Sequence, residues 1–182
     1  MTTQEPYHVP PTLRGLWQRP DTRFLVLFLS ILLAAFTTIA FQTVNDAVVI
    51  PYTSFVARMA GVVLGLLGED ITVAGCELRS PRFAVTIYNG CNGLITSLIF
   101  ISGVLAFPAS WRAKVIGIVG GLLAIQAINL VRIVSLFYIG VFLPDYFDES
   151  HILIWQSLVI LAGVGLWIVW ARAAAAARGT AR

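Results

Sequence analysis

The chain has 182 residues, of which 58% are hydrophobic, and its mean hydropathy is +0.86. About half of the residues of a soluble domain are apolar, so this composition excludes an ordinary soluble protein and favours one compact membrane domain. The net charge of +3 does not indicate nucleic-acid binding, because the basic residues stand beside the apolar runs and form no single patch.

The first apolar run covers residues 24 to about 44 and predicts the first membrane-spanning helix. Residues 1–22 are polar and are interpreted as a cytoplasmic N-terminal arm. A cleaved signal peptide is the alternative interpretation. The length of the apolar run and of the polar segment before it favours an uncleaved anchor.

Residues 52–67 have an amphipathic helical pattern. One face carries Tyr52, Phe55, Val56, Met59, Val63, Leu66 and Leu67, and the other carries Thr53, Ser54, Arg58, Gly61 and Gly65. We expect a helix that lies in the outer membrane interface, with the first face towards lipid and the second towards water. Short β-branched stretches at 71–73 and 83–87, on either side of Gly75 and Ser80-Pro81, predict a small β-hairpin outside the bilayer.

Three further helices are expected at residues 90–107, 114–142 and 151–170, and Pro108 ends the first of them. Residues 172–182 form a basic tail. The predicted fold is therefore an all-α integral membrane bundle of about four transmembrane helices, with the interfacial helix and the hairpin. Residues 23–171 would form a single membrane-embedded catalytic domain.

The distribution of charge predicts the topology, because Lys and Arg in short flanking loops stay in the cytoplasm. Eight of the twelve Lys and Arg residues flank the predicted helices on one side, namely Arg14, Arg19, Arg23, Arg112, Lys114, Arg172, Arg178 and Arg182. Both termini are then cytoplasmic, and the hairpin and its acidic residues lie outside. If residues 52–67 crossed the membrane, this separation would worsen. Whether they cross or lie on the surface stays open.

Cys91 lies in YNGCNG, residues 88–93, at the outer start of the predicted helix 90–107. Unpaired N–H groups and the helix dipole favour an anion there, so we expect the pKa of this thiol to be lowered. Neighbouring glycines would let a substrate carbonyl approach the backbone. We expect Asn89, Asn92, Gly93 and the later Asn129 to support the site or bind substrate. The alternative is a small buried apolar residue, as free cysteines often are.

Arg132 lies within NLVRI, about 27 Å beyond Lys114 on a helix and therefore near the outer boundary. Asn129 and Gln126 share its face. An arginine within an apolar run is costly, which favours a functional role over a snorkelling residue that marks the helix end.

His151 follows the acidic loop LPDYFDES and can transfer protons near neutral pH, although a solvated loop histidine is the alternative. The predicted topology brings Cys91, Arg132 and His151 to one membrane face. We interpret them as nucleophile, stabiliser of thiolate or oxyanion, and acid–base. Cys76 would be a bystander, unless a Cys76–Cys91 disulfide forms. Two cysteines without a CxxC or His/Cys ligand spacing argue against a zinc site, and no cofactor is expected.

These residues resemble the exosortase/archaeosortase family of membrane transpeptidases, through YNGCNG around Cys91, NLVRI around Arg132 and the later His151. The resemblance covers residues 50–155 and is strongest to the compact exosortase H subtype. It implies partners that are exported proteins with a C-terminal motif, a hydrophobic helix and a basic tail. These would be cut and transferred to an acceptor at the periplasmic side of a bacterial inner membrane, in contact with lipid.

Two other functions are considered. A membrane thiol oxidoreductase would use Cys76 and Cys91, but neither cysteine is in a CxxC. A non-enzymatic assembly subunit would use Arg132 and Asn129 to pair with a partner helix. Loss of product after replacement of Cys91 would favour the transpeptidase. The motif recognised, the acceptor and the oligomeric state do not follow from the sequence.

Overall fold

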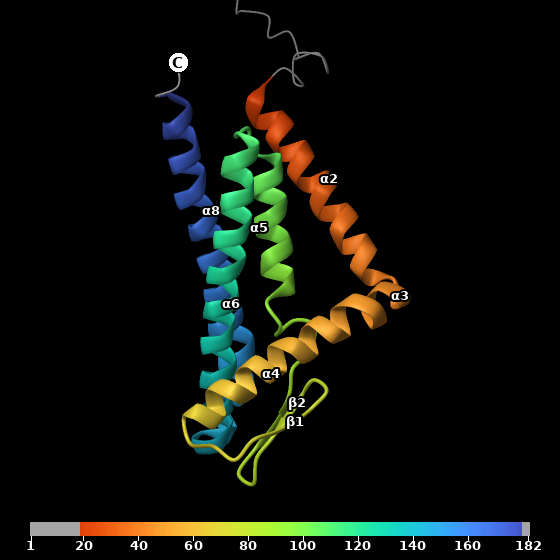
Figure 1. The fold of residues 1–182 in the computed structure, drawn as a ribbon, viewed down its shortest axis with the longest axis vertical. Coiled ribbons are helices and arrows are strands. Elements are labelled where there is room, and N and C mark those ends of the chain that lie inside the picture. Colours follow the sequence, from red (N-terminus) through yellow and green to blue (C-terminus); the bar gives the residue numbers. More distant parts are fainter. Residues whose placement is uncertain (1–18, 180–182) are drawn as a thin grey trace, which may run out of the picture.

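The computed structural model describes residues 19–179, which form a helical bundle with a small sheet at one end (Figure 1). The first elements in chain order are α2 (Pro20–Ala40), α3 (Gln42–Val44), η1 (Asn45–Val49), α4 (Ile50–Leu66), β1 (Thr72–Ala74), β2 (Glu77–Arg79) and β3 (Ala84–Thr86). They are followed by α5 (Leu94–Ala106), α6 (Trp111–Phe142), η2 (Pro144–Tyr146), α7 (Phe147–Glu149), η3 (Ser150–Trp155) and α8 (Gln156–Gly179). Most of the predicted N-terminal arm and the last three residues of the predicted tail lie outside the described residues.

Within residues 19–179, four helical segments are long and apolar enough to cross a membrane. They are Pro20–Ala40, Gln42–Leu66, Trp111–Phe142 and Pro144–Gly179. At about 20 Å, α5 is shorter than the hydrocarbon core, yet it packs against α2, α6 and α8 and runs beside them (Figure 1). The predicted all-α membrane bundle is confirmed, and the chain is a multi-pass membrane protein.

The observed helix boundaries differ from the predicted ones for local reasons. The first helix begins at Pro20, with Asp21 in its first turn, and ends at Ala40 because Phe41 is extended. The helix after the cysteine begins only at Leu94, while α8 continues past Trp170 to Gly179. These shifts leave the predicted order of helices unchanged.

α4 runs across the end of the bundle, at a large angle to α5, α6 and α8 (Figure 1). Length and hydropathy alone would allow Gln42–Leu66 to cross the membrane. A helix transverse to the spanning helices lies near the membrane plane, so the direction of α4 favours the interfacial helix that the sequence predicted.

The side of this helix that was expected to meet water packs in part against the protein, since Thr53 and Gly61 are buried. The protein covers mostly small residues, namely Thr53, Val56, Ala57, Ala60, Gly61 and Leu64. Phe55 and Leu66, on the face expected to meet lipid, are 57% and 83% exposed. Small residues allow close approach: a Cβ on Gly61 would lie 2.5 Å from the Val73 side chain. In an interfacial helix the large apolar residues can face lipid instead.

The predicted hairpin is a three-stranded antiparallel sheet in the order β1-β2-β3. Val73 pairs with Leu78 and Leu78 with Val85. Leu78 is fully buried against α4, and Phe83 packs against Gly140 near the end of α6. The predicted stretches at 71–73 and 83–87 form β1 and β3, and the middle strand β2 was missed because its charged residues Glu77 and Arg79 interrupt the β-branched pattern. β3 forms one wall of the site described next.

Candidate functional site

Cys91 lies in a tight turn just before α5. The sequence had predicted a position in the first turn of the helix, and this prediction is wrong. The first helical residue is Leu94, and the Cys91 N–H donates to the Tyr88 carbonyl at 2.8 Å. The thiol is buried, with 9% of the residue exposed, and it joins the core cluster beneath the sheet. The Cys91 N–H is therefore already engaged within the turn.

Asn92 attaches this turn to its neighbours and is itself completely buried. Its Nδ2 donates to Thr53 Oγ1 on α4 at 2.8 Å, and its Oδ1 accepts the Leu94 N–H at 3.0 Å. Its carbonyl accepts from Gln126 Nε2 on α6 at 3.4 Å. These bonds hold the position of Cys91 relative to three helices, so Asn92 is a positioning residue.

Gly93 supplies a backbone conformation that few other residues adopt. Its φ is +79°, and a Cβ there would lie 2.7 Å from Gln126 Oε1 and 3.2 Å from Asn129 Cγ. The left-handed conformation reverses the chain into α5 while the turn packs closely on α6. Glycine is thus required on both conformational and steric grounds.

Gly93→Ala is expected to destabilise the protein by about 1–3 kcal/mol, because alanine is strained at positive φ and its Cβ would collide with Gln126. Circular dichroism during thermal unfolding of the purified full chain in detergent measures the loss. Gly90→Ala is the matched control, since nothing lies within 4 Å of a Cβ there. Equal unfolding midpoints for the two variants would contradict the requirement.

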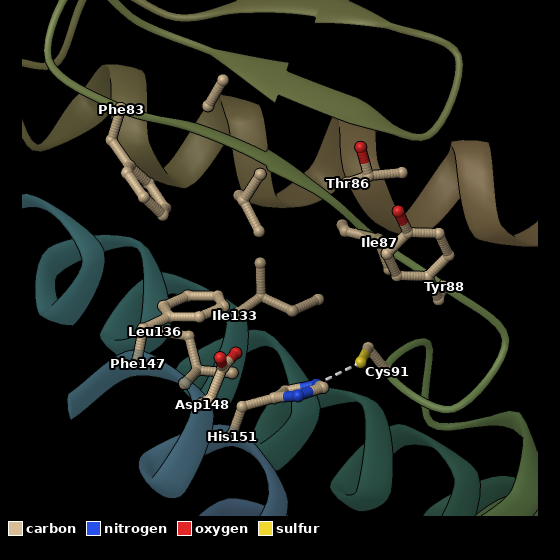
Figure 2. Close-up of a pocket in the computed structure, with 12 residues that line it drawn as sticks. Phe83, Thr86, Ile87, Tyr88, Cys91, Ile133, Leu136, Phe147, Asp148 and His151 are labelled. Carbon is tan, nitrogen blue, oxygen red and sulfur yellow. Dashed lines mark hydrogen bonds between the residues drawn. The ribbon is translucent and has the colours of Figure 1, made fainter. Parts of the chain in front are cut away.

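His151 lies in η3, a π-helical segment continuous with α8, rather than at a helix start. π-Helical turns are rare and often occur at functional sites. The imidazole stacks on Phe147, with ring centroids 6.1 Å apart and an interplanar angle of 12°. This contact orients the ring towards the turn that carries Cys91 (Figure 2).

The structure brings together the three residues that the sequence singled out. Cys91 Sγ lies 2.5 Å from His151 Nε2, as the dashed line in Figure 2 marks, and Arg132 Nη2 lies 3.8 Å from the same sulfur. One thiol thus has a proton acceptor and a cation as neighbours. The three side chains come from the turn before α5, from α6 and from η3.

Burial raises the pKa of the Cys91 thiol above its ordinary value. Arg132 and a hydrogen bond with the Tyr88 backbone act in the opposite direction but are smaller effects. The expectation of a lowered pKa is therefore wrong, because Cys91 precedes the helix and is shielded from water. At neutral pH the thiol is protonated, and a base must remove its proton as it reacts.

Arg132 is buried without a carboxylate partner among the described residues. It is 1% exposed, and its Nε has no hydrogen-bond partner within residues 19–179. In the same part of the chain, both side-chain polar atoms of Asn129 and the Oε1 of Gln126 are also buried without partners. Such atoms normally bind water or a ligand. Gln126, Asn129 and Arg132 thus form a row of polar side chains on the face of α6 that packs against the Cys91 turn.

A cavity of about 370 Å³ opens beside Cys91 and His151. Phe83 to Tyr88 line one side, Ile133, Leu136 and Phe147 line the other, and Cys91, His151 and Asp148 complete it (Figure 2). Among the described residues, no cluster of three or more His, Cys, Asp or Glu side chains could hold a metal ion. A substrate reaching Cys91 would pass between an edge strand and α6.

The four supporting residues lie in different surroundings. Asn92 and Gly93 follow Cys91 directly, and Asn129 lies against Gly93. Asn89 is exposed and donates to Asn45 Oδ1 at 2.9 Å. Asn89 thus connects the turn to η1.

Three residues near the site were missed. Thr53 accepts from Asn92, Tyr52 hydrogen-bonds Gln126, and Asp148 interacts electrostatically with His151. Of these, only Asp148 could have been found from the sequence, because a residue three positions before His151 on a helix lies beside it.

Comparison with known families gives a match over most of the chain. Residues 15–171 match the family model described as transmembrane exosortase. The chain belongs to the exosortase family. The residue pattern had predicted this family, and membership supports a membrane transpeptidase-type role in general. No curated protein and no solved structure gives a significant match.

The second cysteine of this exosortase lies in a different environment. Both cysteines are free, and the Cys76 Sγ lies 3.4 Å from Ser54 Oγ on α4. Cys91 instead contacts His151 and Arg132. The two thiols have separate partners, so the structure gives no support to a dithiol site.

Proposed function

We propose that the chain is a membrane cysteine protease and transpeptidase that cleaves C-terminal sorting signals of exported proteins. The observation that carries the proposal is the Cys91 thiol in contact with the His151 imidazole, beside the buried Arg132 guanidinium and at an open cavity. Nucleophile, base and cation in this arrangement suit acyl transfer.

The reaction would proceed in two steps. His151 Nε2 takes the Sγ proton as the sulfur attacks the substrate carbonyl carbon, and the carbonyl electron pair moves to oxygen near Arg132. Collapse breaks the C–N bond, and the imidazolium gives its proton to the leaving amine. The acyl group is then a thioester on Cys91. An acceptor nucleophile, deprotonated by His151, attacks the thioester, and the sulfur leaves and regains its proton.

Substrates would be exported proteins that end in a short motif, a hydrophobic helix and a basic tail, as in the sorting signals of this family. The enzyme would lie in a bacterial inner membrane with both termini in the cytoplasm and Cys91 at the periplasmic face. The charge distribution supports this orientation, since Arg112 and Lys114 lie at the opposite end of α6 from the sheet (Figure 1). The compact H subtype stays a prediction.

Capture of the acyl-enzyme tests the proposal. Membranes that contain the full chain and a tagged substrate are quenched in acid during turnover and digested, and the peptides are analysed by mass spectrometry. The Cys91 peptide is expected to carry the substrate acyl group, which hydroxylamine removes as it does other thioesters. A Cys76→Ala variant should give the same adduct. An adduct on Cys76, or product formed by a protein without Cys91, would contradict the proposal.

A further inference from the structure

The cavity beside Cys91 has an unusual wall. Six consecutive residues, from Phe83 to Tyr88, line it. Successive side chains of a strand point to opposite faces, so a cavity on one face would be lined by alternate residues only. Lining by every residue means that the cavity touches the main-chain edge of β3. Figure 2 shows this segment passing between the sheet and the α6 side of the cavity.

The free edge of β3 faces away from β2. The Ile87 N–H donates to the Cys76 carbonyl and the Phe83 carbonyl accepts the Ser80 N–H, both at 2.9 Å. The backbone N–H and C=O groups of Phe83 and Ile87 thus point to β2. Such residues alternate along an antiparallel strand, so the backbone groups of Val85 also point to β2. Ala84 and Thr86 therefore direct their N–H and C=O groups to the edge that no strand within residues 19–179 covers, because β3 is the last strand of the sheet.

This row of free backbone groups leads to the nucleophile. Tyr88 is the next residue in the alternation, and its backbone interacts with the Cys91 thiol. Figure 2 shows Cys91 at the Tyr88 end of the segment and Phe83 at the other end. The opposite wall is apolar, formed by Ile133, Leu136 and Phe147. An extended peptide between the two walls would have its main chain bound on one side and apolar contacts on the other.

The direction of such a peptide follows from the fold. The sheet lies at the end of the bundle, beyond α4 and away from the helix ends that carry Arg112 (Figure 1). The substrate residues before the cut belong outside the membrane, and the apolar helix after the cut must enter it. The segment before the cut would therefore run from the Ala84 end towards Cys91, which is parallel to β3.

We propose that the substrate segment before the cut binds as a fourth strand of the sheet, parallel to β3, and this rests on the proposed peptidase function. In a parallel pair, the N–H and C=O of one peptide residue bond to two different residues of the neighbouring strand, which are two positions apart. The third residue before the cut donates to the Ala84 carbonyl and accepts from the Thr86 N–H. The first residue before the cut donates to the Thr86 carbonyl, and its carbonyl oxygen lies at the Tyr88 N–H beside Cys91.

Cysteine cross-linking in membranes tests the register. The full chain carries Cys76→Ala and Cys91→Ala, which trap the uncut substrate, together with Thr86→Cys or Ala84→Cys. The tagged substrate carries one cysteine at each of the four positions before the cut. On mild oxidation, Thr86→Cys is expected to cross-link to the second position and Ala84→Cys to the fourth. The first and third positions face the other side of the strand.

A proline substitution tests the same inference through activity. Thr86→Pro removes the N–H that points to the free edge and leaves the β2–β3 hydrogen bonds in place, so processing is expected to fall about tenfold or more. Val73→Pro is the control, because Val73 holds the equivalent position on β1, the opposite edge of the sheet. It is expected to process substrate within about twofold of the wild-type rate. Thermal unfolding of both variants checks that each is folded.

The outcomes separate the two proposals. Cross-links in the reversed order, or no more cross-linking at β3 than with Val73→Cys, would overturn the fourth-strand proposal while leaving Cys91 as nucleophile. If Cys91→Ala still releases product, the peptidase proposal fails, and the cross-links still report the position of the bound segment.

Discussion

Cys91→Ala is expected to lower the rate of substrate processing by about 10⁴-fold or more, because it removes the sulfur that contacts His151 Nε2 and would form the covalent intermediate. The substitution removes a single sulfur atom from a turn whose conformation depends on Asn92 and Gly93, so the fold should be retained. Quantitative immunoblotting of tagged substrate and product in membranes measures the rate. Cys76→Ala is the matched control and should retain most of the activity.

Cys91 and His151 are also expected to act as one unit. His151→Gln alone should lower the rate about 10²–10⁴-fold, through loss of the proton acceptor 2.5 Å from Sγ. In the Cys91→Ala background the same change should have almost no further effect, since there is no thiol left to deprotonate. Multiplicative losses in the double variant would show that the two residues act separately. Processing at the wild-type rate by Cys91→Ala would refute the nucleophile assignment.

The sequence predicted the helical order and the family because those signals are local. Apolar runs and charged flanks need only neighbouring residues, and the motifs around Cys91, Arg132 and His151 are short. The meeting of the three residues also followed, because the topology limits which helix ends share a membrane face.

Features that depend on tertiary contacts were predicted less well. The packing of the small-residue side of α4 was not predicted, because it depends on contacts with distant segments such as that of Gly61 with Val73. The sign of the Cys91 pKa shift was wrong because desolvation depends on what covers the thiol. Thr53 and Tyr52 could not be connected to the site before α4 was placed beside the Cys91 turn.

Arg132→Met is expected to lower processing about 10²–10³-fold while leaving the protein as stable as the wild type, or up to about 3 kcal/mol more stable. The two effects have opposite signs because Arg132 is buried without an anionic partner among the described residues. A buried unpaired cation costs desolvation energy in the resting protein. Its benefit appears only when a thiolate or oxyanion forms beside it.

The same variant should change the pH dependence of Cys91. Arg132 lowers the pKa of this thiol, although burial raises it more, so removal of the cation raises the pKa further above its ordinary value. At any fixed pH less thiolate is present, and the alkylation profile of Cys91 should move to higher pH. Iodoacetamide labelling against pH, in a Cys76→Ala background, measures this shift.

Arg58→Met is a suitable control for Arg132, because Arg58 is exposed on α4. It should leave both the processing rate and the alkylation profile of Cys91 within about twofold of the wild type. A purely structural role for Arg132 predicts a different result, namely lost stability with an unchanged alkylation profile. Lower activity together with equal or higher stability and a profile shifted to higher pH would instead identify Arg132 as a cation that acts on the reacting sulfur and oxygen.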